Sequence, residues 1–424
     1  MKTIGFSVLV LGAMIAMTAC SSQDDLIDHL PQTTKKNETN RQNTNIPGAS
    51  TVLVYMAGRN NLTSDLDQDL EEIKRGSLGI GDNNLIVFVR RYKDNEKPWV
   101  ARIHKGEVID SVSLANIGIA DPEPMACDPE VMETVMDYAF KRYPAIKDYG
   151  LVLWGHGGGW LMQDSIAGTR GFGRDDGALQ SNSSKWVNIP TLSKVLKKMP
   201  HMKFIMCDCC NMMCLENLYE LRQTTDYMIG STAEIPSDGA PYDEILPDLF
   251  AGGNFWKQIV DKYYAAQFHM LPLSVVKMSE MINVADATRH VLPGVKDAIG
   301  KGYANMTGMI HYFNQGNNQE DFSPDLNIFY DAGDFIRHYA PAADYQLWKK
   351  ALDEAVIYKK MSVCWATELS WNKYYGDFTM TTEKYHGVSM FVPQDPTKGS
   401  YGKMNIDIKQ LSWYNAVGLN TLEQ

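Results

Sequence analysis

The chain contains 424 residues, of which 44% are hydrophobic and 21% are charged, and its formal net charge is −11. These fractions are those of a folded globular protein and exclude a disordered or fibrous chain, and the length is sufficient for a large buried core. The acidic balance disfavours nucleic acid as a partner, because nucleic acid requires clustered Lys and Arg, and it weakly favours basic substrates.

The N-terminus has the pattern of an export signal. Lys2 precedes an apolar run from Ile4 to Met17, and small residues follow up to Cys20. A short apolar segment of this kind is typical of a secretory signal peptide and is shorter than a membrane-spanning helix. We therefore predict a signal peptide over residues 1–19.

The end of this segment, Met-Thr-Ala-Cys at residues 17–20, resembles a bacterial lipobox, in which Cys20 becomes the acylated first residue of the mature protein. The alternative is an ordinary cleaved signal with an incidental cysteine. With the lipid attached, we expect an exported protein anchored to the cell envelope, at the outer membrane. The acidic segment after Cys20 resembles a tag for exposure at the cell surface.

Residues 21–48 are polar and rich in Asn, Thr, Gln and Lys, so they cannot bury enough apolar surface to fold. Together with Cys20 they predict a flexible tether over residues 20–48, followed by a folded domain over residues 49–424.

The first part of this domain alternates buried strands with helices. Continuous apolar runs predict strands, and apolar residues at helical spacing predict the intervening helices. In chain order we expect a strand at 51–56, a helix ending at Gly76, a strand at 85–89, a hairpin at 100–108, a helix at 128–142, a strand at 149–154, a helix at 190–199, a strand at 204–208, a helix ending at Leu221 and a strand at 227–233. This alternation predicts an α/β fold, with a mostly parallel sheet and helices on both faces.

The last third of the chain is harder to interpret. Residues 273–276 and 388–392 have the apolar pattern of further strands, and the sequence between them is mainly helical. We therefore expect a helical insertion at about 277–385, forming a C-terminal subdomain.

Two of the predicted strands end in reactive side chains. His156 follows the strand at 149–154, and Cys210 follows the strand at 204–208. Functional groups in open α/β sheets gather at the carboxyl ends of the strands, so the imidazole and the thiol can meet if these two strands are neighbours. A His beside a Cys supplies a general base and stabilises the thiolate, which makes this pair a candidate nucleophilic site.

Three glycines follow the histidine, at residues 157–159. They remove side chains where a substrate backbone would approach. The amides of Gly157 and Cys210 could donate hydrogen bonds to an oxyanion formed on attack. The alternative is a glycine turn beside a histidine with a purely structural role.

The alternation of side chains along a strand distinguishes among the neighbouring residues. Asp208 and Cys210 should project to one side of the sheet, and Cys209 to the other. This favours Cys210 as the nucleophile and places a carboxylate beside it. A buried carboxylate needs a cationic partner, so Asp208 is a candidate floor of a pocket for a substrate Arg or Lys. The alternative is a structural Asp that binds loop amides.

The cysteines allow a second interpretation. Besides Cys20, four of the seven cysteines lie within eight residues, namely Cys207, Cys209, Cys210 and Cys214. Such spacing does not form a disulfide framework for a domain of this size. Cys207 and Cys210 have a zinc-like spacing, and His156 could contribute, but no second pair completes a structural site. A Cys-rich metal-binding module is therefore the less favoured alternative, and we predict no metal.

The motifs LVLWGHGGGW at 151–160 and CDCCNM at 207–212 together resemble the clostripain family (C11) of clan CD cysteine peptidases. Further matches cover roughly residues 50–395 and include 52–56, 60–62, 143–145, 238–242 and 387–393. The resemblance implies a caspase-like fold and a cysteine endopeptidase that cleaves proteins or peptides after Arg or Lys. It implies that His156 is the base, Cys210 the nucleophile and Asp208 the ligand of the P1 side chain.

Two residues depart from the pattern of the family. Cys209 stands where the family usually has Ala, and Asn211 where it usually has Leu. Neither change removes a catalytic group. A catalytically inactive surface-binding lipoprotein of the same fold is the main alternative, and the presence of all three functional side chains argues against it.

The resemblance also implies maturation by self-cleavage and stimulation by calcium. The polar segment 161–185 follows the histidine and offers three basic cleavage sites, Arg170, Arg174 and Lys185. The chemistry itself needs no cofactor. The sequence has no calcium loop of EF-hand spacing, so any calcium site would be assembled from scattered carboxylates.

Overall fold

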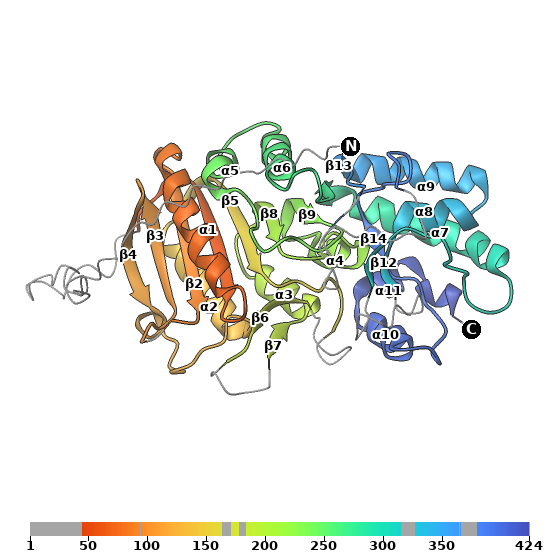
Figure 1. The fold of residues 1–424 in the computed structure, drawn as a ribbon, viewed down its shortest axis with the longest axis horizontal. Helices are drawn as coiled ribbons and strands as arrows, with labels where there is room; N and C mark the ends of the chain where they lie inside the picture. The colour runs from red at the N-terminus through yellow and green to blue at the C-terminus, as the bar shows by residue number, and fades with distance from the viewer. Residues whose placement is uncertain are drawn as a thin grey trace, which may run out of the picture. The chain divides into compact units, whose positions relative to one another are not determined.

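A nine-stranded sheet forms the centre of the computed structural model (Figure 1). The structure describes residues 45–93, 95–162, 171–177, 184–314, 327–363, 365 and 380–423. The predicted signal peptide, Cys20 and residues 21–44 of the predicted tether lie outside the described residues, as does Arg170. No helix within the described ranges is long and apolar enough to cross a membrane.

The sheet is parallel at its centre and antiparallel at both edges, in the order β13-β10-β9-β8-β5-β1-β2-β3-β4. The parallel strands are β1 (Gly48–Gly58), β2 (Asn84–Arg91), β5 (Ala145–Gly155), β8 (Met202–Asp208) and β9 (Thr225–Ser231). The antiparallel edge strands are β3 (Trp99–His104), β4 (Glu107–Ser113), β10 (Leu273–Lys277) and β13 (Val356–Lys360). The α/β fold with a parallel central sheet is thus confirmed.

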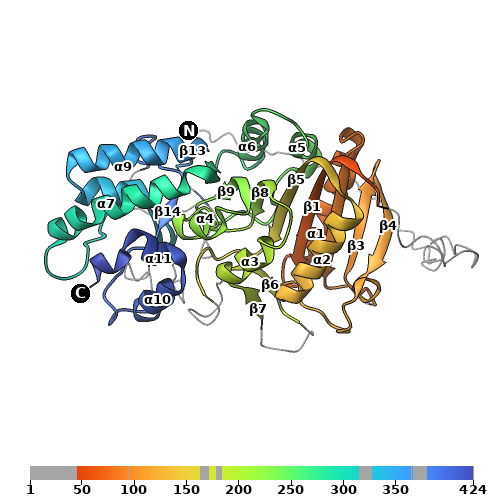
Figure 2. The ribbon, with the colours of Figure 1, turned by 180° about the vertical axis from the view of Figure 1, so that it is seen from behind.

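Helices cover both faces of this sheet because alternate residues of each central strand point to opposite sides. In β1, Leu53 and Tyr55 belong to one apolar cluster, and Val52 and Val54 to another. The second cluster includes α1 (Thr63–Gly76), α5 (Tyr242–Leu249) and α6 (Phe255–Ala266) (Figure 1). The first includes α2 (Pro129–Arg142), α3 (Ile189–Leu196) and α4 (Leu215–Leu221), which Figure 2 shows from behind.

Helix α2 illustrates how local sequence fixes an element. Asp128 caps its N-terminus by accepting a hydrogen bond from the amide of Glu130 at 2.8 Å. Pro129 occupies the first turn, where its missing N–H is not needed. Lys141 and Arg142 lie in the last turn, where positive charge interacts favourably with the helix dipole. The predicted helix at 128–142 therefore forms with nearly the same bounds.

The C-terminal part contains strands that the sequence pattern did not predict. Its helices are α7 (Met281–Ile299), α8 (Ala332–Tyr339), α9 (Ala342–Ala355), α10 (Tyr401–Asp407) and α11 (Ser412–Val417). Strands β11 (His311–Asn314), β12 (Asn327–Asp331) and β14 (Ser389–Met390) form a separate three-stranded sheet. The strand expected at 388–392 is present as β14 and belongs to this smaller sheet, whereas β13 joins the main sheet from within the predicted helical insertion. These strands have at most five residues, which is too short for a clear alternating pattern.

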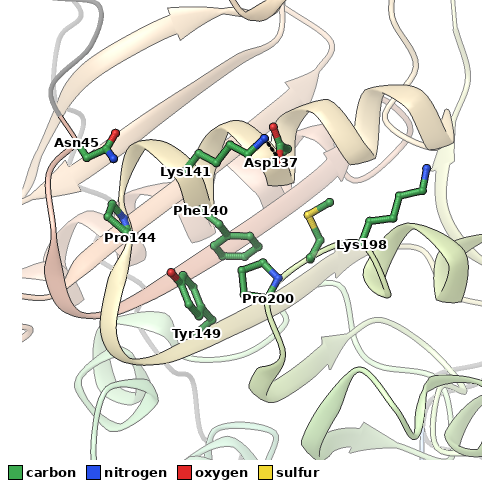
Figure 3. A pocket seen from close by; sticks show the side chains of 9 residues that line it. Asn45, Asp137, Phe140, Lys141, Pro144, Tyr149, Lys198 and Pro200 are labelled. Atoms are coloured by element: carbon green, nitrogen blue, oxygen red, sulfur yellow. Dashed lines mark ion pairs between the residues drawn. The ribbon is translucent and has the colours of Figure 1, made fainter.

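A pocket of about 660 Å³ lies where β5 begins and α2 and α3 end (Figure 3). Phe140, Pro144 and Tyr149 provide its apolar wall, and Lys198 lies at its rim. It is therefore at the amino edge of the parallel strands, away from His156 and Cys210 at their carboxyl edge.

Candidate active site

The two candidate reactive residues follow neighbouring parallel strands. Strands β5 and β8 pair in register, with Trp154 opposite Asp208. His156 and Cys210 each lie two residues beyond this pair. The backbone between them is tightly packed, because a Cβ added to Gly157 would lie 2.5 Å from the carbonyl oxygen and 3.0 Å from the amide nitrogen of Cys210. The predicted juxtaposition of the two strand ends is present, and Gly157 permits it.

His156 is held by contacts from two loops. Its Nε2 atom lies 2.8 Å from Oδ1 of Asn61, and its carbonyl oxygen accepts a hydrogen bond from the amide of Gly173 at 2.9 Å. The ring of Trp186 lies at a centroid distance of 6.0 Å. Burial and the positive charge of Arg174 lower the pKa of His156 to about 4, so the imidazole is neutral at physiological pH.

Cys210 is the one described cysteine that is not fully buried. Its Sγ atom accepts a hydrogen bond from the amide of Ile235 at 3.3 Å. Burial and the negative charge of Glu234 raise the pKa of the Cys210 thiol to about 12. In this conformation the thiol of Cys210 and the imidazole of His156, which follow the paired strands β8 and β5, are therefore both neutral.

The residue after Cys210 turns the chain sharply. Asn211 has a φ of +59°, and its amide donates to the carbonyl oxygen of Ala233 at 3.0 Å. Asn adopts this left-handed conformation more readily than branched residues do. The polar side chain at this position is thus explained by the local backbone.

Two backbone amides at the site are available for a ligand. Within the described ranges, the N–H groups of Gly157 and Cys210 have no backbone acceptor. Gly157 pairs with Phe172 in an isolated antiparallel bridge, and the hydrogen bonds of this bridge come from the amides of Gly158 and Gly173 instead. Two amides next to a thiol, neither used in the backbone ladder, are the donors that an oxyanion would need.

Asp208 projects to the face opposite Cys209, as the alternation along β8 predicts. It is 4% exposed and accepts hydrogen bonds from the hydroxyls of Tyr242 and Tyr263 at 2.7 and 2.5 Å, and from the amide of Ala240 at 3.2 Å. Cys209 lies in the apolar cluster on the other face. Asp208 forms no ion pair with any described Lys, Arg or His, and burial raises its pKa.

A second buried carboxyl group, Asp69, lies beside Asp208. Asp69 is 2% exposed and accepts a hydrogen bond from Nε1 of Trp154 at 2.6 Å. A Cβ added to Gly239, which has a φ of +57°, would lie 3.1 Å from carboxylate oxygens of both Asp69 and Asp208. Burial and the negative charge of Asp208 raise the pKa of Asp69 to about 9.

This pKa makes the stability of the protein depend on pH. An Asp in the unfolded chain titrates at about 3.9, so between that pH and about 9 the folded protein binds one proton more than the unfolded chain. The contribution of Asp69 to the free energy of unfolding is intact below the pKa of the unfolded chain. It is lost as the pH rises above that pKa, by up to about 1.4 kcal/mol per pH unit. We expect Asp69→Asn to reduce the fall in Tm between about pH 5 and pH 8, as measured by thermal denaturation. Asp82→Asn, at an exposed position, is the matched control. Equal slopes for Asp69→Asn and the wild type would contradict the expectation.

The residues proposed for self-cleavage lie on the segment after His156. Arg174 is in β6 (Phe172–Asp175), and Lys185 begins β7 (Lys185–Val187), which pairs with β6. Nε of Arg174 donates a hydrogen bond to Oδ1 of Asp176 at 2.8 Å. The backbone carbonyl oxygen of Arg174 accepts a hydrogen bond from the side-chain amide of Asn60 at 2.8 Å.

The sequence interpretation missed several of these residues. Asn61, Tyr242 and Tyr263 gave no signal of their own, because their roles depend on contacts across the sheet. Asp69 did give one: it interrupts the apolar stripe of α1 between Leu66 and Ile73, and an acid on a buried stripe needs a partner.

The metal-binding alternative has little support from the described cysteines. Cys207, Cys209 and Cys214 are buried in the apolar core. No group of three or more His, Cys, Asp or Glu side chains in the described part of the chain is arranged to hold a metal ion. Calcium binding stays a prediction of the sequence.

A thiol and an imidazole at adjacent strand ends, next to two amides without a backbone acceptor among the described residues, form a site of the kind used by cysteine-dependent hydrolases. The clostripain family, peptidase C11, matches residues 54–421. The chain therefore belongs to the clostripain family of cysteine peptidases.

Individual relatives agree with this assignment. Clostripain from Hathewaya histolytica is 26% identical over 253 residues, which are 55% of this chain and 47% of that protein, so the chain spans about half the length of this relative. A secreted C11 cysteine protease from Bacteroides thetaiotaomicron, solved with an irreversible peptide inhibitor, has a TM-score of 0.70 and 26% identity, with 88% of this chain and 100% of the solved chain covered. An inactive zymogen C11 protease from Parabacteroides distasonis has a TM-score of 0.69 and 27% identity, with 87% and 98% covered.

Proposed function

We propose that the protein is a cysteine endopeptidase that cleaves after Arg or Lys, with Cys210 as nucleophile and His156 as general base. The observation that carries the proposal is the placement of Cys210 and His156 at the ends of paired strands β8 and β5, in a chain of this family. A neutral thiol beside a neutral imidazole becomes a nucleophile when the proton moves from sulfur to nitrogen.

The reaction follows from this pair. Sγ of Cys210 bonds to the scissile carbonyl carbon, its proton passes to His156, and the carbonyl electrons move to oxygen, where the amides of Gly157 and Cys210 donate to the oxyanion. The C–N bond then breaks, and the imidazolium gives its proton to the leaving amine. Water next attacks the thioester and gives a proton to His156. The C–S bond breaks, the acid product leaves, and the proton returns to sulfur.

Asp208 is proposed to bind the P1 side chain. It lies two residues before Cys210, and no described cation neutralises it. A guanidinium or ammonium entering beside it would favour the charged carboxylate and lower its pKa. The alternative role, in which Asp208 only holds the loop of Ala240 and Tyr242, has support from the same hydrogen bonds.

The neutral site supports a resting form that is matured by self-cleavage. Arg174 lies close enough to lower the pKa of His156, and it is part of the segment that would be cut. Because Arg174 and Lys185 belong to paired strands, cleavage after either would require β6 and β7 to separate. Arg170 lies outside the described residues and stays a candidate from the sequence, and we take it as the site to test first.

We expect the purified wild type to yield two fragments on incubation, with a new N-terminus at Gly171. Arg170→Ala should remain one chain over the same time, because the preferred basic residue is gone. N-terminal sequencing and intact mass measure both results, and Lys185→Ala is the control that should still be cut. Identical cutting of a Cys210→Ala form would show that the cleavage is not the protein's own.

Export and anchoring remain proposals. The relative from B. thetaiotaomicron is described as secreted, which supports export of this chain. Attachment of lipid at Cys20 would hold the enzyme at the outer membrane, and fatty-acid labelling of cells that express the wild type and Cys20→Ser tests this. The substrates would be proteins or peptides with accessible basic residues. Activity measured with and without a chelator tests the predicted stimulation by calcium.

A covalent probe tests the proposed function directly. A peptidyl acyloxymethylketone with Lys or Arg at P1 should add one probe mass to Cys210, because only an activated thiolate displaces the leaving group. Absence of labelling and of peptide hydrolysis, in both the single-chain and the cleaved protein, would instead favour a surface-binding protein without activity.

A further inference from the structure

The loop between β1 and α1 brings a side-chain amide to the candidate general base. Strand β1 lies beside β5, with Ala57 paired to Gly155, so the loop that follows β1 emerges next to His156. Asn61, in this loop, places Oδ1 at 2.8 Å from Nε2 of the imidazole. The strand pairing that brings Cys210 to one side of His156 therefore brings Asn61 to it from the neighbouring strand.

The loop that carries Asn61 is fixed by its neighbours. The side chain of Asn60 is 1% exposed, donates to the carbonyl oxygens of Ala57 at 3.1 Å and Arg174 at 2.8 Å, and accepts from the amide of Leu62 at 2.8 Å. The hydroxyl of Thr63 donates to the carbonyl oxygen of Gly58 at 2.7 Å. The position of the Asn61 backbone is thus set by several bonds, while its own side chain is used for the imidazole.

This contact favours one tautomer of the neutral ring. A carboxamide oxygen accepts hydrogen bonds and cannot donate, so with Oδ1 of Asn61 facing the ring the contact is a hydrogen bond only when Nε2 of His156 carries the N–H. Nδ1 is then the unprotonated nitrogen. It has no hydrogen-bond partner among the described residues, and it is the atom available to take a proton from a thiol.

We propose that Asn61 is a positioning residue for the general base, holding His156 in the Nε2–H tautomer and in the ring orientation that presents Nδ1 to the thiol of Cys210. The inference rests on the proposed function. The amide oxygen also accepts from Nε2–H after Nδ1 is protonated, so the same bond orients the ring when it returns the proton to the leaving amine.

A neutral amide and a carboxylate at this position should have different consequences. A carboxylate would stabilise the imidazolium and raise its pKa, whereas the amide orients the ring with little effect on its charge. The other charged groups that act on His156 are Arg174, which lowers the pKa, and Asp176, which raises it. Neither is altered by a substitution of Asn61, so the pH dependence of the reaction reports the change at this one contact.

The test compares Asn61→Ala and Asn61→Asp with the wild type, and Ser64→Ala, at an exposed position at the start of α1, is the matched control. The kinetic parameters kcat and KM are measured from about pH 5 to pH 9. The value of kcat is expressed per active site, and the active sites are titrated with the acyloxymethylketone. We expect Asn61→Ala to lower kcat by about 10²-fold, the size of effect that a misplaced catalytic group produces, with KM nearly unchanged. Asn61→Asp should recover part of kcat and move the pH profile of kcat/KM to higher pH.

Two results would overturn the inference. One is a kcat for Asn61→Ala within about threefold of the wild-type value, since a misplaced base costs much more. The other is an Asn61→Asp profile that coincides with that of the wild type, with both variants changing only Tm, as a purely structural role requires. Failure of the proposed function is distinguishable, because in that case the wild type itself would neither bind the probe nor hydrolyse the peptide.

Discussion

Cys210→Ala is expected to lower kcat/KM for an arginyl peptide by about 10⁴-fold or more, to the limit of detection. The reason is that the thioester cannot form without Sγ, and neither Asp208 nor His156 can replace it as a nucleophile at this position. Substrate should still bind, because the oxyanion amides and the candidate P1 pocket remain. Hydrolysis of a fluorogenic peptide and labelling by the acyloxymethylketone measure the loss.

The chain supplies a matched control in the adjacent cysteine. Cys209 is 1% exposed and projects into the apolar cluster on the opposite face of the sheet, so Cys209→Ala should keep kcat within a few-fold of the wild type. Loss of its sulfur should lower the free energy of unfolding by about 1 kcal/mol. Full activity of Cys210→Ala together with inactivity of Cys209→Ala would reverse the assignment of the nucleophile.

The sequence was sufficient to predict the elements that carry the site. The apolar runs of β5 and β8 are short, continuous and bounded by polar residues, which is the pattern of a strand buried on both faces. Because parallel strands expose their carboxyl ends at one edge, the side chains after these two runs could be placed together before the structure was known. The alternation along β8 likewise separated Asp208 from Cys209.

The partners of these side chains could not be predicted in the same way. The hydroxyl of Tyr263 reaches Asp208 from α6, and Asn61 reaches His156 from a loop almost a hundred residues away in the chain. Such contacts depend on how helices and loops settle on the sheet, and no local pattern encodes them. The strands β11, β12 and β13 were missed for a related reason, since short strands acquire their alternation from packing against the rest of the fold.

The surroundings of the thiol explain why the site is neutral in this conformation. The segment after β9 lies against Cys210 through Ile235, and Glu234 adds a negative charge that opposes ionisation of the thiol. On the other side, Arg174 opposes protonation of His156. Both neighbours therefore disfavour the thiolate–imidazolium pair. Movement of either segment when a substrate binds or the chain is cut would favour the reactive form.

Asp208→Asn is expected to abolish the preference for basic residues at P1. A substrate Arg or Lys would lose its buried ionic partner, and breaking such a pair costs about 3–5 kcal/mol, or about 10²- to 10³-fold in kcat/KM. Peptides with a neutral P1 residue should be affected much less. A positional peptide-library digest, followed by kcat/KM for Arg, Lys and Leu at P1, measures both effects.

Tyr242→Phe distinguishes this role from a purely structural one. It removes one hydrogen bond from Asp208 and leaves the carboxylate in place, so it should lower stability by about 1 kcal/mol and retain the basic P1 preference. If Asp208 served only to hold the loop, Asp208→Asn and Tyr242→Phe would lower Tm together and reduce the hydrolysis of all peptides by the same factor. A library profile for Asp208→Asn that still favours Arg and Lys would assign the recognition of the P1 charge to another acidic residue. Asp69, which shares the space beside Gly239 with Asp208, would then be the next residue to substitute.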